Sequence, residues 1–87
     1  MIQPEIKIWR ESKFPNADIW DIYEKLLEEV GELGKSIAKE NLNSQRLELG
    51  DVGVVLCGIA DELNIDLVKS IEFSHKKNLK KPKQFNT

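Results

Sequence analysis

Four carboxylates in the middle of the chain occur as two pairs with the same spacing. Glu29 and Glu32 are three residues apart in one segment. Glu48 and Asp51 repeat that spacing in the next segment. Side chains three residues apart lie on one face of an α-helix, so each pair can present two acids to one point. Carboxylate oxygens without His or Cys partners suit Mg²⁺, with Mn²⁺ as an alternative, rather than zinc. The spacing therefore predicts a divalent-cation site, provided that the two helices pack side by side.

The two acid pairs fall on segments with helical periodicity. Apolar residues recur every three or four positions over residues 19–40, which predicts a long amphipathic helix. Residues 45–63 are apolar almost all round and too long for one strand, which predicts a central helix. Short helices are expected at 4–13 and 67–79. The predicted fold is all-α: a four-helix bundle-like subunit with a long antiparallel helix pair and short N- and C-terminal helices.

Polar residues mark the expected ends of these helices. Asp18 is a good N-cap for the long helix, and Asp66 is a good N-cap for the last one. Asn43 or Ser44 is expected to cap the central helix. Asn64 suits the left-handed conformation in which many helices end.

The position of the second acid pair needs an explanation, because Glu48 and Asp51 fall on the apolar face of their helix. An unpaired ionised carboxylate in apolar surroundings is costly, or it takes up a proton. Three arrangements are open at this point. The acids pair with basic groups such as Lys35 or Arg46, they emerge into water at the start of the helix, or they bind a cation.

The length of the chain predicts one domain, spanning residues 1–87, with a thin core. A chain this short buries only about 60–65% of the surface that it exposes when unfolded. We therefore expect copies of the chain to associate, as a homodimer or a tetramer. Residues 80–87 are basic and are expected to form a flexible tail of the domain.

Charge and cysteine content narrow the classes of function. A net charge of −2 and a pI of about 5.4 oppose nucleic-acid binding, although lysines gather after Phe73. The single cysteine, Cys57, cannot form an intramolecular disulfide. No apolar run resembles a signal peptide or reaches the length of a membrane span. We expect a cytoplasmic protein without a membrane or nucleic-acid partner.

These motifs, taken in order, resemble those of the MazG-like, all-α nucleoside triphosphate pyrophosphohydrolases. That family shares an ExxE element, a spacer, an ExxD element and a later Lys-Asn. The matching segments are EVGE at 29–32, ELGD at 48–51 with fifteen residues between, and Lys77-Asn78. Lys81 stands where the family often has a basic residue.

The resemblance covers about residues 19–81 and implies an activity. That activity is Mg²⁺-dependent hydrolysis of an NTP or dNTP to the monophosphate and pyrophosphate, in nucleotide-pool house-cleaning. It implies that the four acids hold the metal directly or through water, and we choose Glu32 as the general base. Lys77 and Lys81 would neutralise phosphate charge, and Asn78 would bind phosphate or sugar. Neither the base nor the sugar of the substrate follows from the sequence.

Some of these residues have plainer interpretations. The lysines also suit a solvated helix end, where cations are favoured by the helix dipole. Trp20 is assigned to substrate binding, although it can equally pack in a core, as can Trp9 and Phe14. The alternative function is a non-catalytic helical dimerisation module, in which the acids are interface charges.

Overall fold

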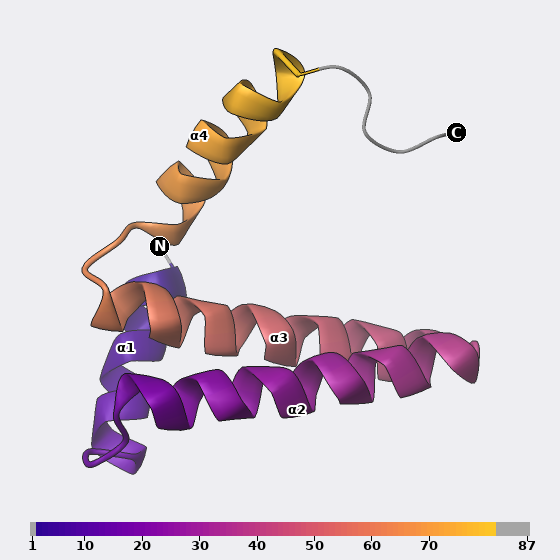
Figure 1. Cartoon of the computed structure of the whole chain (residues 1–87). Coiled ribbons are helices and arrows are strands. Elements are labelled where there is room, and N and C mark those ends of the chain that lie inside the picture. Colours follow the sequence, from indigo (N-terminus) through magenta and orange to yellow (C-terminus); the bar gives the residue numbers. More distant parts are fainter. Residues whose placement is uncertain (1, 82–87) are drawn as a thin grey trace.

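A computed structural model describes residues 2–81, which fold into four helices (Figure 1). In chain order they are α1 (Ile2–Lys13), α2 (Ile19–Ala38), α3 (Leu42–Glu62) and α4 (Leu67–Leu79). These residues contain no strand, and the predicted all-α class is confirmed. Within the same range, no helix combines the length and the apolar character that crossing a bilayer requires. Most of the predicted basic tail, residues 82–87, lies outside the described residues.

Two of the helices begin at the predicted N-caps. The Asp18 carboxylate accepts a hydrogen bond from the backbone N–H of Asp21 at 2.9 Å, and the Asp21 carboxylate accepts one from the N–H of Asp18 at 3.0 Å. This reciprocal pair is a capping box, which satisfies two backbone donors at the start of α2. At the start of α4, the Asp66 carboxylate accepts from the N–H of Lys69 at 3.1 Å. Both predicted caps are confirmed.

The start of α3 differs from the prediction. The side chain of Asn41 accepts a hydrogen bond from the N–H of Ser44 at 2.9 Å, and the helix begins at Leu42. The prediction of Asn43 or Ser44 as the cap was wrong. Several residues in this turn have similar capping ability, and capping at the earliest one adds nearly a turn of helix. Asn64 has a φ of 56°, as expected for a residue that ends a helix in the left-handed region.

The central helix is α3, which contacts each of the other three helices. It lies antiparallel to α2 along most of its length, and α1 crosses the end where α2 begins and α3 finishes (Figure 1). The core of one chain is small, and its buried apolar side chains are Ile22, Cys57 and Ala60. The long antiparallel pair is as predicted, and most of its large apolar side chains are half-buried or exposed.

Close approach of α1 to α3 depends on Gly58. A Cβ at this position would lie 3.2 Å from Cδ of Arg10 and 3.4 Å from Cγ2 of Ile22. Arg10 packs over this gap and is only 9% exposed. Its Nη2 reaches Oε2 of Glu62 at 3.5 Å, which partly compensates the buried charge. This arginine therefore joins the end of α3 to α1.

Helix α4 is attached through one residue of α1. The Gln3 side chain donates to Oδ1 of Asp61 at 2.8 Å and to the carbonyl of Ile65 at 3.0 Å. The side-chain carbonyl of Gln3 accepts a hydrogen bond from the N–H of Leu67, the first residue of α4, at 3.0 Å. From there α4 points away from the α2–α3 pair (Figure 1), and none of its residues is buried.

Candidate metal centre

Three of the four sequence-predicted acids meet in the fold. Glu29 from the middle of α2 and Glu48 and Asp51 from the first half of α3 place carboxylate oxygens within 4.8 Å of one another. Glu29 is 9% exposed, and the other two side chains are half-buried. The antiparallel packing of α2 on α3 produces this meeting, because it sets the first half of α3 beside the second half of α2.

The fourth acid, Glu32, lies beside this group and not within it. Its side chain is 51% exposed, and its Oε1 is 3.4 Å from the Nζ of Lys35. Lys35, which the sequence offered as a partner for the acids of α3, therefore pairs with an acid of its own helix. The negative charge of Glu32 still acts on Glu48, whose pKa it helps to raise.

Electrostatics at the group of three favours a cation. The pKa of Glu48 is raised, first by loss of solvation and then by the negative charges of Asp51, Glu29 and Glu32, with a hydrogen bond to Glu29 adding to it. Like charges brought together in this way repel one another, and a bound cation removes the repulsion. The donors are carboxylate oxygens alone, which suits the hard cations Mg²⁺ and Mn²⁺. The residues present therefore fit such a metal.

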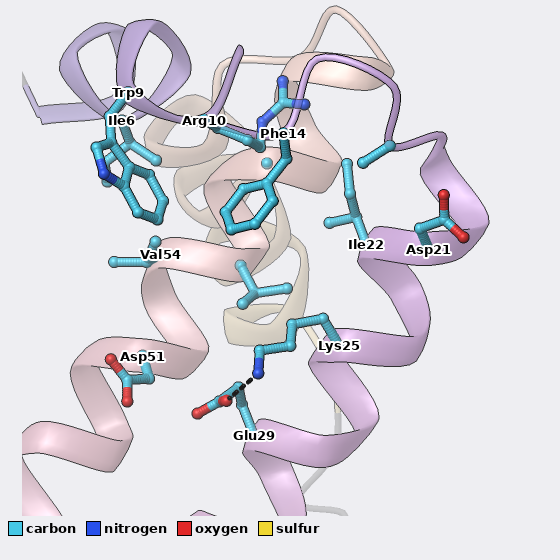
Figure 2. A pocket seen from close by; sticks show the side chains of 13 residues that line it. Ile6, Trp9, Arg10, Phe14, Asp21, Ile22, Lys25, Glu29, Asp51 and Val54 are labelled. Atoms are coloured by element: carbon cyan, nitrogen blue, oxygen red, sulfur yellow. Dashed lines mark ion pairs between the residues drawn. The ribbon is translucent and has the colours of Figure 1, made fainter. Parts of the chain in front are cut away.

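A lysine that the sequence interpretation did not single out lies against this group. Nζ of Lys25 pairs with Glu29 (Figure 2), at 3.2 Å from its Oε1. The same Nζ is 3.9 Å from Oε2 of Glu28. The pKa of Lys25 is raised, most strongly by its hydrogen bond to Glu29 and next by the charge of Glu28. The signal was present in the sequence, because residues four apart share a helix face. The side chain of Glu28 is 71% exposed, so this acid is a surface charge.

A pocket of about 550 Å³ adjoins the acids and is bounded by α1, α2 and α3. Trp9 and Phe14 line one part of it in an edge-to-face pair, with ring centroids 5.9 Å apart. Glu29 and Asp51 lie at the other end, where Lys25 pairs with Glu29 (Figure 2). An apolar pocket with a few polar groups at one end is the usual form of a small-molecule site. The size and lining of this pocket allow it to hold an aromatic ring system beside a metal.

The remaining sequence-predicted residues lie elsewhere. Trp20 is 69% exposed, contacts Tyr23 edge-to-face at 6.1 Å, and does not line the pocket. Lys77 and Asn78 are exposed in the last turn of α4, and Lys81 follows that helix. None of these three lines the pocket, and α4 leads away from the acids of its own chain (Figure 1). The fold of one chain therefore does not bring them to the acids.

Comparison with known proteins gives one result that bears on this site. The family model of the MazG nucleotide pyrophosphohydrolase domain matches residues 20–85, a range that contains all four acids and the lysines of α4. No curated protein and no solved structure matches the chain. The family match covers most of the sequence and includes both helices that form the group of acids.

Proposed function

The chain belongs to the MazG nucleotide pyrophosphohydrolase family, and we propose that it hydrolyses a nucleoside triphosphate with the help of Mg²⁺. An NTP or dNTP would yield the monophosphate and pyrophosphate, a reaction suited to nucleotide-pool house-cleaning. One observation carries this proposal. Three carboxylates have oxygens within 4.8 Å of one another, and two of them, Glu29 and Asp51, line a pocket that is also lined by aromatic rings.

The metal would be held by Glu29, Glu48 and Asp51. Glu32 lies at the margin and would take part directly or through water. When bound, Mg²⁺ supplies a charge that offsets the triphosphate and a means of activating water. Mn²⁺ prefers the same ligands and is the natural substitute.

Glu32 is our choice for the general base. Its carboxylate is half-exposed and stands outside the group of three, so it is available to accept a proton while the other acids hold the metal. In the proposed reaction, water adds across the anhydride bond between the first and second phosphates. That bond breaks, the monophosphate and pyrophosphate separate, and the proton from water passes to Glu32.

The nucleoside part of the substrate would occupy the pocket beside Trp9 and Phe14. Stacking on an aromatic ring is open to every base, so this contact supplies affinity without selecting a base. Trp20, our initial assignment, lies on the exposed side of α2 and would contact substrate only from outside this pocket. Trp9 and Phe14 are therefore better placed than Trp20 to face the base.

We further propose that the chain assembles as a homodimer or a tetramer. Large apolar side chains remain exposed on α4, where Val68 is 53% and Ile71 58% exposed, and on α2, where Leu27 is 56% exposed. A second copy of the chain is the occupant that we assign to these faces. Lys77 and Asn78 point away with α4 from the acids of their own chain. In an assembly they would reach phosphate, together with Lys81, at the site of another copy.

A cytoplasmic location fits this activity, because nucleotides are made and used there. Cys57 is a free thiol and is buried in α3. Burial raises its pKa, with a smaller contribution from the charge of Asp61, so the residue stays a neutral thiol. A thiol kept in this state suits a reducing compartment.

The proposal is tested by incubating the purified protein with each common NTP and dNTP, in Mg²⁺ and in EDTA. Release of pyrophosphate with at least one nucleotide, lost in EDTA, is the expected result. If every nucleotide survives in Mg²⁺ and in Mn²⁺, the proposed reaction is wrong, and the chain is better described as a helical dimerisation module. Release of single phosphates instead of pyrophosphate would identify a different reaction.

A further inference from the structure

Two cations line the pocket, and they are held very differently. Arg10 is fixed: its side chain is 10% exposed, packs on Gly58 and pairs with Glu62. Lys25 has a side chain that is 55% exposed, and it is held only by carboxylates of its own helix. Exposed ion pairs of this kind contribute little to stability. Of the two, Lys25 is therefore the cation that can change its partner.

The present partner of Lys25 is one of the proposed metal ligands. Its Nζ lies 3.2 Å from Oε1 of Glu29, and the charge of Asp51 also acts on it. A lysine placed four residues before a glutamate is the weaker order of such a helix pair. In Figure 2 the ammonium group lies at the end of the pocket that holds the acids, next to Glu29. A metal held by the acids and a phosphate of the nucleotide would therefore both lie next to Lys25.

We propose that Lys25 alternates between two partners, pairing with Glu29 in the metal-free protein and with a phosphate oxygen of the nucleotide once a divalent cation binds the acids. This inference rests on the proposed function and adds a phosphate-binding residue from α2 to it. The flexible stem of lysine allows its three donors to turn from a carboxylate to a phosphate. A lysine from α4 of another copy is not needed for this contact, because Lys25 lies beside the acids of its own chain.

The proposal predicts two effects of opposite sign when the charge of Lys25 is removed. Without nucleotide, the ammonium competes with the metal for Glu29, so its loss should tighten metal binding. With nucleotide, the ammonium donates to phosphate, so its loss should weaken substrate binding or turnover. A lysine that only stabilises α2 would not move the two quantities in opposite directions.

The variants are Lys25→Gln, which removes the charge, and Lys25→Arg, which keeps it. Lys39→Gln is the matched control, because it removes the same charge from an exposed lysine at the end of α2 that does not line the pocket. Mg²⁺ and Mn²⁺ affinities are measured by calorimetry without nucleotide. KM and kcat are then measured at saturating Mg²⁺ with the best nucleotide.

For Lys25→Gln we expect metal binding tighter by about two- to fivefold, the scale of an exposed ion pair. We expect kcat/KM to fall by about ten- to a hundredfold, the scale of a charge-assisted hydrogen bond. Lys25→Arg should restore most of kcat/KM, and Lys39→Gln should match the wild type in both measurements. The melting temperature of each variant shows that the fold is retained.

Metal affinity that is unchanged or weaker in Lys25→Gln would overturn the competition with Glu29. An unchanged kcat/KM would overturn the phosphate contact while leaving the proposed function standing. If the wild type itself neither binds Mg²⁺ nor releases pyrophosphate, the proposed function fails, and this inference fails with it. These results are distinguishable, because the first two are read against an active wild type.

Discussion

Helices α2 and α3 hold the group of acids, whereas α4 contributes no residue to it or to the pocket. The first pair is antiparallel and in contact along most of its length, and α1 closes one end of it (Figure 1). By contrast, α4 has no buried residue and joins the rest through Gln3 and the end of α3. One chain is therefore enough to assemble the group of acids, but it leaves a whole helix with its apolar side chains uncovered.

The same two regions also differ in charge. The acids concentrate on α2 and the start of α3, and the lysines concentrate toward the end of α4. Lys25, Lys35 and Arg46 are basic residues within the acidic region, and of these Lys25 pairs with Glu29. A triphosphate beside a metal needs positive groups, and only Lys25 and Arg10 line the pocket in the described part of the chain. The open question about α2 and α4 is therefore which of the two helices supplies the basic side chains that would face the phosphates.

The largest effect is expected from a change to the acids themselves. Asp51→Asn removes a ligand charge, and we expect turnover to fall by at least about a hundredfold, because loss of even a supporting group around a metal costs ten- to a hundredfold. Mg²⁺ should raise the melting temperature of the wild type and not of this variant, because we expect only the wild type to bind it.

Glu24→Gln is the control for that prediction. Glu24 is an exposed acid of α2 that lies outside the group of three, so its change should leave turnover and the Mg²⁺ effect in place. Wild-type turnover in Asp51→Asn would show that the α2–α3 pair does not carry the metal. The comparison between the two regions would then lose its basis.

A smaller effect is expected in the aromatic part of the pocket. Trp9→Ala should raise KM by about tenfold or more, because stacking of one base on one ring contributes on that scale. Trp20→Ala should leave KM close to that of the wild type, because Trp20 does not line the pocket. Steady-state kinetics on the two variants decide which tryptophan faces the base. A larger rise of KM in Trp20→Ala than in Trp9→Ala would place the base outside the pocket.

The smallest effect on the fold of one chain is expected on α4. Changing both Val68 and Ile71 to Ser alters exposed positions, so the free energy of unfolding of the monomer should change by about 0.5 kcal/mol or less per site. The molecular mass in solution should nevertheless fall, because these side chains are assigned to contacts with another copy. Light scattering coupled to size exclusion measures the mass.

The neighbouring exposed acid provides the control on α4. Glu72→Gln lies on the same helix and should keep the wild-type mass. An unchanged mass in the Val68 and Ile71 double variant would remove α4 from the proposed interface. A wild type that is already monomeric would remove the interface altogether, and with it the proposed contact of Lys77 with another copy.

The amino-acid sequence alone determined the helices of this protein, because their signals are local. Apolar periodicity located α2, the length of an almost wholly apolar run located α3, and Asp18, Asp66 and Asn64 marked three of the ends. The largest error in a helix boundary, at the start of α3, arose among neighbouring polar residues, where the capping preferences of Asn41 and Asn43 are too similar to separate. The spacing of the acids was readable for the same reason, since it concerns residues one turn apart.

Only the tertiary structure decided which side chains meet. The contact between Glu29 and the acids of α3, with Glu32 left at the margin, depends on how α2 and α3 are rotated against each other. The meeting of Trp9 and Phe14 beside that site, and the direction of α4, depend on how α1 crosses the pair and on the bonds of Gln3. These arrangements result from packing between residues far apart in the sequence, which no local pattern records.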